Sequence, residues 1–256
     1  MFEVSKHSMH YKANYQDYDW LYQHFIIDGM THEEMAKLIG CSSRVIKKWC
    51  VEKYRLTNEL RLKTVQLTDK QRSIIIGGLL GDGHIDKRER YPVFIVAHAE
   101  NQKDYLYWTY NELKNLCNHS PTFYQGKENH QIKNSVCDTQ SFYRFETRSY
   151  KCIGELRKLN LHQIVDNLDE LSFSIWVLDD GNYDRKAWRI CAPFSIEDCK
   201  YILEQLKNKF NIQGIISIHN NYNYVRFLRS DSRIINDIIL RNIPNDLDII
   251  KYKITC

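Results

Sequence analysis

Three glycines within five residues interrupt an apolar run that ends at Asp82, in the stretch from Ile74 to Asp86, which reads Ile-Ile-Ile-Gly-Gly-Leu-Leu-Gly-Asp-Gly-His-Ile-Asp. Glycine inside a helix costs about 1 kcal/mol relative to alanine, so this many glycines indicate that another backbone comes very close. Gly77 and Gly81 lie four residues apart, and this spacing would let a second helix touch the first. The carboxylate of Asp82 would then project from the base of the contact. The alternative is a strand that ends in a glycine-rich turn, but the spacing matches neither a phosphate-binding loop nor a dinucleotide-binding fingerprint.

A second stretch, from Ser172 to Asp184, repeats this pattern and also ends its apolar run in Asp-Gly. Its acid, Asp180, lies 98 residues after Asp82. The similarity continues in a tyrosine-rich helical pattern and in a strand pattern: 102–116 matches 196–210, and 142–149 matches 224–231. An internal duplication of this kind predicts a pseudo-two-fold molecule within one chain.

The two stretches resemble the paired motifs of the LAGLIDADG homing endonucleases, in the monomeric branch that carries both motifs in one chain. The second motif there often reads Trp-x-x-Asp-Asp-Gly, as Trp176 to Gly181 does. The resemblance covers roughly residues 67 to 254. It implies an α+β fold in which a duplicated αββαββα core forms a DNA-binding saddle over residues 64–256, with repeats at about 67–165 and 166–256.

Strands of this core are expected near residues 92–99, 122–125, 141–147, 188–192, 215–219 and 222–228, with a polar loop over 126–134. They would form two sheets with the motif helices between them. Arginines recur at matched positions of the two repeats, interleaved with tyrosines, which favours a basic surface suited to the major groove of DNA.

The N-terminal region has the pattern of a small helical domain, predicted over residues 1–63. Thr31 and Glu34 make a capping box, and Gly40 marks a turn before a third helix that runs to about Tyr54. This order resembles a helix-turn-helix. Seven Lys and Arg face two acids between residues 42 and 63, which favours contact with DNA phosphates over a helical brace for the larger domain.

The residues predicted to contact DNA therefore lie on that third helix, at a hairpin tip and on or beside the strands. They are Arg44, Lys47, Lys48, Arg88, Arg144, Arg148, Arg185, Lys186, Arg189, His219, Arg226 and Arg229.

Net charge and cysteine usage restrict the class of protein and its cellular compartment only broadly. The formal charge of +4 is too small to indicate nucleic acid by itself. Eight cysteines without a Cys-x-x-Cys pair are typical of buried thiols in a reducing compartment rather than of zinc sites or disulfides. We expect an intracellular, soluble protein, either cytoplasmic in a bacterium or phage or organellar, that is not secreted and acts as a monomer without a membrane partner.

Two acids at the ends of adjacent packed helices predict a divalent metal site. Carboxylates close to each other and to phosphate need cations between them, and hard oxygen ligands with open positions suit Mg²⁺. We expect two or three Mg²⁺ ions held by Asp82 and Asp180, the predicted catalytic acids. Gly81 and Asp179, which precede the acids, are placed at the same metal site, although Asp179 is expected to point away from its centre.

The resemblance also implies a lysine near each metal site. Lys253, in the ending Tyr-Lys-Ile, is the candidate of the second repeat and the third predicted catalytic residue. The first repeat lacks the corresponding lysine pattern, and whether His162, Gln163 or no residue takes that role stays open.

The predicted function is that of a site-specific homing endonuclease, which makes a double-strand break in a long DNA target by Mg²⁺-dependent phosphodiester hydrolysis. Two alternatives share this scaffold. One is an intron RNA maturase, and the other is a transcription regulator derived from the family. Both acids are present, which favours cleavage.

Overall fold

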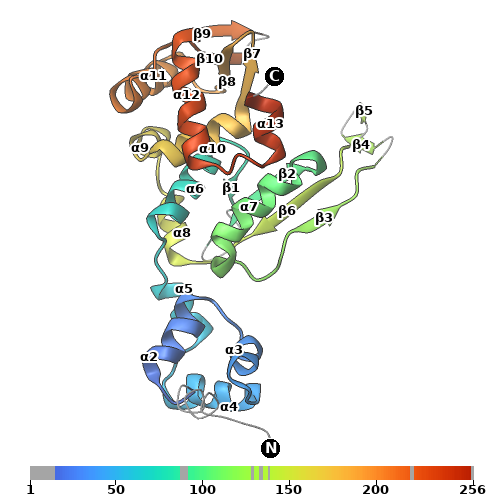
Figure 1. The fold of residues 1–256 in the computed structure, drawn as a ribbon, viewed down its shortest axis with the longest axis vertical. Coiled ribbons are helices and arrows are strands. Elements are labelled where there is room, and N and C mark those ends of the chain that lie inside the picture. The colour runs from blue at the N-terminus through green and yellow to red at the C-terminus, as the bar shows by residue number, and fades with distance from the viewer. Residues whose placement is uncertain are drawn as a thin grey trace, which may run out of the picture.

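The computed structural model describes residues 15–86, 92–127, 130–132, 135–137, 139–219 and 222–254. A helical N-terminal part lies at one end of the molecule, and α5 (Asn58–Thr64) joins it to a larger part that contains two four-stranded sheets (Figure 1). Within these ranges, no helix is both long and apolar enough to cross a lipid bilayer. The six cysteines whose side chains are described are free thiols, at positions 41, 50, 117, 152, 191 and 199.

The N-terminal part is a bundle of short helices around a small apolar core. Thr31 and Glu34 form the predicted capping box, and Gly40 ends that helix in the left-handed conformation, with φ of 70°. The helix expected to run to Tyr54 is α-helical only at its start and continues as a π-helix. The elements are α2 (Tyr18–Leu21), η1 (Tyr22–Ile27), α3 (His32–Ile39), α4 (Ser43–Lys47) and η2 (Lys48–Lys53).

This N-terminal part is fixed to the larger part by buried polar contacts. The side chain of Arg61, on α5, is 1% exposed, lies over the ring of Phe25 and donates to the backbone carbonyls of Phe25 and Met30. From the other side, the Asn115 amide donates to the carbonyl of Ile27. The Arg61 contacts are shielded from water, so breaking them would leave each group unpaired at a cost of roughly 1 to 3 kcal/mol, whereas the Asn115 contact is exposed and contributes less.

Two helices, α6 (Asp69–Leu80) and α10 (Glu170–Asp180), pack against each other at the centre of the larger part. A Cβ atom at Gly77 would lie only 2.5 Å from the Ser172 carbonyl oxygen, so the predicted backbone contact is confirmed here. At Gly81 the neighbour is instead the side chain of Asp179. At the other end of the pair, the Ser73 hydroxyl donates to the carboxylate of Asp169.

The two halves have the same sheet topology, which confirms the duplication. Both sheets are antiparallel, with strand order β1-β2-β6-β3 in the first half and β7-β8-β10-β9 in the second. The strands of the first sheet are β1 (His84–Ile85), β2 (Phe94–Ala99), β3 (Thr122–Tyr124) and β6 (Phe142–Glu146). Those of the second are β7 (Gly181–Asp184), β8 (Ala187–Cys191), β9 (Gly214–His219) and β10 (Tyr222–Phe227).

The remaining helices cover the inner faces of the sheets and link the halves. Inward-facing strand residues such as Val96, Phe145, Val225 and Phe227 are buried beneath them. The remaining helices are η3 (Glu100–Gln102), α7 (Lys103–Leu113), η4 (Lys114–Leu116), α8 (Lys151–Leu156), α9 (Leu161–Asp166), α11 (Ile196–Phe210), α12 (Arg229–Asn242) and α13 (Asp248–Ile254).

The prediction of a continuous loop over 126–134 is wrong. A two-stranded hairpin of β4 (His130–Ile132) and β5 (Ser135–Cys137) occupies this region. Each segment is only three residues long, which is too short for an alternating apolar pattern to reveal a strand.

We predict that Gly77→Ala lowers the free energy of unfolding by about 2 to 3 kcal/mol, because the added methyl group overlaps the Ser172 carbonyl and the Ile175 side chain, and the helices must separate to admit it. Chemical denaturation measures the change. Gly154→Ala, on α8, is the matched control, since its nearest neighbour is the Pro92 ring at 3.3 Å and alanine favours a helix. Equal stability of Gly77→Ala and the wild type would contradict close helix packing.

Candidate active site

Asp82 and Asp180 stand at the C-terminal ends of α6 and α10, where the two central helices meet. Asp82 is close enough for its charge to act on Asp180. Burial first, and then the charges of Asp82 and Asp179, raise the pKa of Asp180 to about 7. The two acids that the duplicated motifs predict thus stand at the same end of the helix pair.

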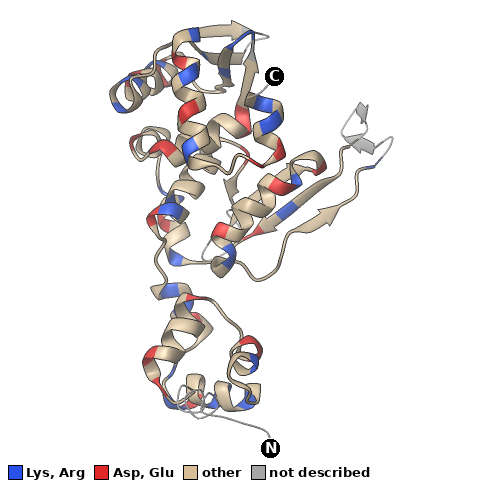
Figure 2. Cartoon of the chain, viewed as in Figure 1, with Lys and Arg blue, Asp and Glu red and all other residues tan. Residues whose placement is uncertain are grey.

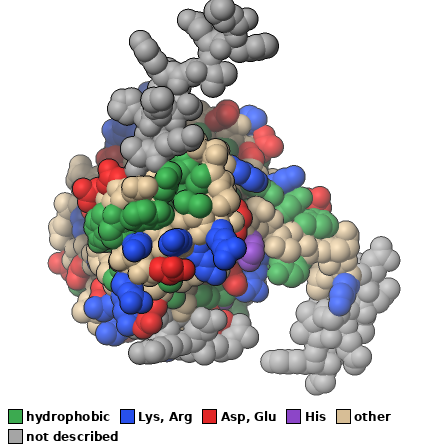
Figure 3. Space-filling model, turned by 90° about the horizontal axis from the view of Figure 1, so that it is seen from below, with side chains coloured by type: hydrophobic (Ala, Val, Ile, Leu, Met, Phe, Trp, Pro, Cys, Tyr) green, Lys and Arg blue, Asp and Glu red, His purple; other side chains and the backbone are tan. Residues whose placement is uncertain are grey.

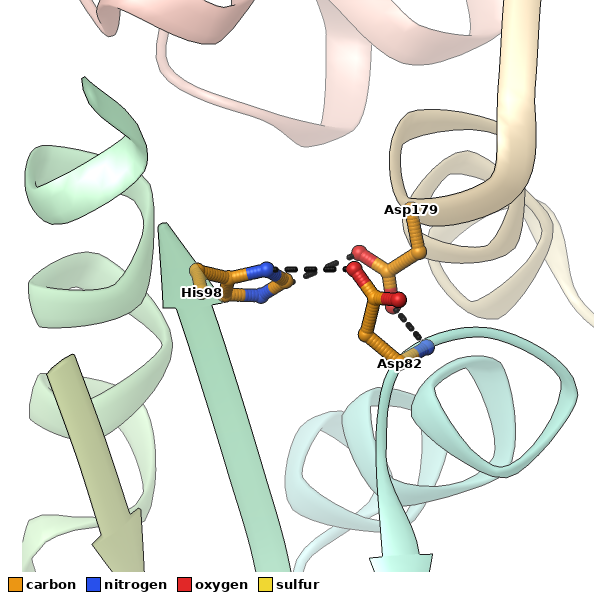
Figure 4. A group of neighbouring side chains, drawn as sticks. All are labelled: Asp82, His98 and Asp179. Atoms are coloured by element: carbon orange, nitrogen blue, oxygen red, sulfur yellow. Dashed lines mark hydrogen bonds and ion pairs between the residues drawn. The ribbon is translucent and has the colours of Figure 1, made fainter. Parts of the chain in front are cut away.

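Asp179 lies inside this cluster, so the expectation that it points away is wrong. Its side chain is 2% exposed, and its carboxylate accepts a hydrogen bond from the backbone N–H of Asp82 at 3.1 Å (Figure 4). It also accepts one from the Tyr105 hydroxyl at 3.0 Å. Gly81 leaves the room that this side chain fills. Burial raises the pKa of Asp179 to about 6, although the neighbouring His98 opposes the shift.

His98, on β2, is a site residue that the motif analysis missed. Its ring is 2% exposed and points toward both acids, with Nδ1 3.2 Å from Asp82 Oδ2 and Nε2 4.0 Å from Asp179 Oδ1 (Figure 4). Burial lowers the pKa of His98, but the two carboxylates outweigh this effect and raise it overall. A signal was available, because His98 follows Phe94 and Val96 on the inward face of a strand, where a polar side chain is unusual.

Lys253, on α13, brings a positive charge to the second motif. Its ammonium donates to the backbone carbonyls of Leu178 and Gly181, the latter at 3.0 Å, and so covers the C-terminal end of α10. Burial lowers the pKa of Lys253, and the charges of Asp179, Asp82 and Asp180 oppose this shift.

The two open candidates for a basic residue in the first repeat are engaged elsewhere. His162 contacts Asp198, on α11, at 2.9 Å, and Gln163 belongs to the capping box of Asn160 at the start of α9. Neither has a recorded contact with the acid cluster. Among the described residues, only Asp82, His98 and Asp179 form a His and carboxylate group that could hold a metal ion, with donor atoms within 4.8 Å of one another.

Several predicted DNA contacts lie on the outer faces of the two sheets. Arg144 alternates with buried Phe145, and Arg226 alternates with buried Val225 and Phe227, so both arginines face away from the covering helices. Arg189 pairs directly with Arg226 across β8 and β10 and lies over the Tyr224 ring. Arg144 is also paired with Glu146 at 2.9 Å, which partly neutralises it.

The other predicted contacts are more scattered (Figure 2). Arg185 and Lys186 form the exposed left-handed turn between β7 and β8, and Arg229 begins α12. Arg148 instead lines a cavity at the junction with the N-terminal part, together with Glu34 and Lys114. Arg88 and the side chain of His219 lie outside what the structure describes.

The N-terminal part carries its own basic residues. Arg44, Lys47 and Lys48 are exposed on α4 and the start of η2. Seen from below, the end of the molecule that this part forms carries Lys and Arg side chains beside an apolar area and some acids (Figure 3).

A sequence profile of the LAGLIDADG DNA endonuclease family matches residues 72–234, a range that contains both acid motifs and most of both sheets. The chain belongs to this family. Its two motifs are the paired ends of α6 and α10 described above.

Curated relatives include an mRNA maturase, intron-encoded endonucleases and RecA proteins. Cytochrome b mRNA maturase bI2 of Saccharomyces cerevisiae is 29% identical over 71% of this chain and 46% of its own length. Probable intron-encoded endonuclease 1 of Wickerhamomyces canadensis is 22% identical over 78% of this chain and 90% of its own. The chain thus spans less than half of the maturase, and it spans 27% of a matching RecA protein of Mycolicibacterium chitae.

A solved structure shares the fold. It is the homing endonuclease I-WcaI bound to its DNA recognition sequence, with a TM-score of 0.63, 20% identity and coverage of 85% of this chain and 96% of that one.

We predict that the metal-free protein loses thermal stability as the pH rises from about 4 to 7. An unfolded aspartate has a pKa of about 3.9, whereas the folded values are about 6 for Asp179 and about 7 for Asp180. The folded state therefore binds more protons in this window, and its stability falls as they leave. Thermal unfolding in a chelator, at pH 5 and pH 7.5, measures the slope.

Asp180→Asn should flatten this slope, because the amide does not ionise. Asp246→Asn, at an exposed aspartate, serves as the control and should keep the wild-type slope. An unchanged slope in Asp180→Asn would show that Asp180 ionises normally in the folded protein.

Proposed function

We propose that this chain is a site-specific homing endonuclease that makes a double-strand break in DNA by Mg²⁺-dependent phosphodiester hydrolysis. The observation that carries the proposal is the pairing of Asp82 and Asp180, one from each half, at the ends of two packed helices. One acid for each half suits one cut in each strand. Because a single chain supplies both, the protein acts as a monomer.

The site fits divalent cations by its donor set. The charge of Asp82 raises the pKa of Asp180, which favours a cation between the two carboxylates, and the backbone carbonyl of Gly81 would add a hard oxygen donor. Asp82 and Asp180 would hold the ions, with Gly81 and Asp179 beside them. Bound Mg²⁺ would supply an activated water and neutralise charge on the leaving oxygen.

Lys253 is the third residue to which we assign a catalytic role. The carbonyls of Leu178 and Gly181 hold its ammonium next to the second motif, where it would neutralise charge that develops on the phosphate. No lysine is recorded at the matching place of the first repeat within the described ranges, so the two strands would be cut at unequal rates.

DNA would lie along the outer faces of the two sheets. Arg144 and Arg226 occupy equivalent positions on these faces, and Arg189 adds a second positive charge on the second sheet. The similarity to I-WcaI, which was solved with its DNA recognition sequence, supports DNA as the partner. We also propose that the N-terminal part is a helix-turn-helix domain, predicted over residues 1–63, that adds phosphate contacts through Arg44, Lys47 and Lys48.

A maturase activity is the second candidate, because cytochrome b mRNA maturase bI2 matches over 71% of this chain. Retention of both acids favours DNA cleavage as the main activity. RNA splicing assays with a host intron would test the second role separately.

We predict that Asp82→Asn or Asp180→Asn lowers cleavage of a target-bearing plasmid by at least about a hundredfold, because each change removes a metal-binding charge. DNA affinity in the absence of metal should stay within about threefold of the wild type. A library of DNA fragments incubated with Mg²⁺ first identifies the target, and gel assays then measure cleavage and binding.

Asp246→Asn removes the same charge at an exposed site and should cut normally. Normal cutting by either Asp82→Asn or Asp180→Asn would rule out the proposed catalytic acids.

We predict that replacing Arg44, Lys47 and Lys48 together by glutamine weakens DNA binding and flattens its salt dependence. Each lost phosphate contact reduces the slope of log affinity against log salt by about 0.9. Cleavage should remain detectable at high enzyme concentration, since these residues lie outside the acid cluster.

The matched control replaces Lys200, Lys207 and Arg233 together by glutamine. These residues are exposed on α11 and α12, the helices that pack on the face of the second sheet opposite its arginines. This variant has the same charge change and should keep the wild-type salt slope. Identical slopes in both variants would show that the N-terminal part does not touch DNA phosphate.

A further inference from the structure

The acid cluster is built differently in the two halves, although their topology is the same. In the first half, His98 on β2 pairs with Tyr143 on β6. In the second half, the equivalent of Tyr143 is Val225 on β10, which pairs with Ile190 on β8, so Ile190 is the equivalent of His98. The second half therefore has a buried aliphatic side chain where the first half has a buried imidazole.

Two further residues beside this imidazole also lack a counterpart of the same kind in the other repeat. Tyr105, on α7, aligns with Cys199 on α11, and Asp179 aligns with Gly81. Tyr105 and Cys199 are both buried, so the difference lies in chemistry and not in exposure. His98, Tyr105 and Asp179 therefore gather beside Asp82, and none of the three has an equivalent polar residue beside Asp180.

We propose that His98 is a nitrogen ligand of a divalent cation, which it binds together with Asp82 and Asp179. This proposal rests on the metal site of the proposed function and names one of its ligands.

The geometry supports a ligand role more than a purely structural hydrogen-bond network. Both oxygens of Asp179 accept hydrogen bonds, from Asp82 N–H and from Tyr105. The Nδ1 atom of His98 lies 3.2 Å from Asp82 but forms no hydrogen bond of acceptable geometry. Nε2, at 4.0 Å from Asp179, is beyond hydrogen-bond distance. The buried imidazole therefore makes ion-pair contacts with both carboxylates but no hydrogen bond of acceptable geometry, and a cation that displaces its proton would take over the positive charge between them.

The spacing of the three donors is close to that around a bound ion. They lie within 4.8 Å of one another, and ligands about 2.1 Å from one ion are separated by about 3 to 4 Å. Asp82 is 42% exposed, so its side chain can rotate to close this gap and leaves the ion open to water and phosphate.

A nitrogen ligand changes which metal is preferred. Imidazole strengthens the binding of transition metals, least for Mn²⁺ and more for Co²⁺ and Zn²⁺, whereas Mg²⁺ prefers oxygen ligands. The first-half position would thus favour Mn²⁺ or Co²⁺ over Mg²⁺, whereas Asp180, with Ile190 on the equivalent strand, has no corresponding imidazole.

The test measures metal binding to the intact protein without DNA. Electron spin-echo spectroscopy of bound Mn²⁺ detects coupling to a directly coordinated nitrogen, and calorimetry gives the affinities for Mn²⁺ and Mg²⁺. We expect nitrogen coupling in the wild type and its loss in His98→Gln. Mn²⁺ affinity should fall at least about tenfold in this variant, while Mg²⁺ affinity changes less than about twofold.

His162→Gln is the matched control, because His162 also contacts an aspartate, Asp198, but lies on α9 outside the cluster. It should keep the wild-type nitrogen coupling. Tyr105→Phe removes a bond to Asp179 without removing a metal ligand, and it should keep the coupling too.

Two results would overturn the proposal. One is Mn²⁺ binding to the wild type without nitrogen coupling, which is decisive even if His98→Gln does not fold. The other is an equal fall of Mn²⁺ and Mg²⁺ affinity in His98→Gln, which would mean that His98 only positions Asp82. Since neither measurement involves DNA or cleavage, the outcome is independent of whether the chain proves to be a nuclease.

Discussion

The close packing of α6 on α10 is the contact on which the rest of the molecule depends. Gly77 admits the Ser172 carbonyl, and the two helices converge so that Asp82 and Asp180 meet at their ends. The same closeness creates an electrostatic conflict, because burial and mutual repulsion raise the pKa of Asp180 to about 7. The interface thus stabilises the fold through packing. It also brings buried carboxylates together at the site, and bound cations would relieve the repulsion between them.

The N-terminal part is held in a fixed position relative to the first half. Asn115 links the two, since its amide donates to the Ile27 carbonyl while its side-chain oxygen accepts from Gln71 on α6. Gly29 is required at this contact, because a Cβ atom there would lie 2.4 Å from the Asn115 carbonyl oxygen and its φ is +75°. The basic residues of α4 and η2 thus belong to a part that is joined to a motif helix through Asn115.

Much of the fold could be predicted from the sequence because the chain contains two copies of the same pattern of helices and strands. The glycine spacing predicted the helix contact at Gly77. The repeated patterns predicted six of the eight strands of the two sheets with errors of only one or two residues at their ends, but missed β1 and β7, which directly follow the motif acids. Local pattern could not show which way Asp179 points, since adjacent acids at a helix end differ only in rotation around the axis. His98 was missed for a related reason: it lies 16 residues beyond Asp82, and only strand pairing brings it back to the acid.

The differences between the halves indicate that the duplicated scaffold supports two unlike sites. Lys253 covers the end of α10 beside the second motif, whereas His98 and Tyr105 gather around Asp82 and Asp179. Each half thus has one kind of nitrogen group near its acid, an ammonium in one and an imidazole in the other. An ammonium has no lone pair and can act only through its charge, while a neutral imidazole can donate a lone pair to a metal. Equal backbone symmetry therefore does not imply equal chemistry at the two strands of a duplex.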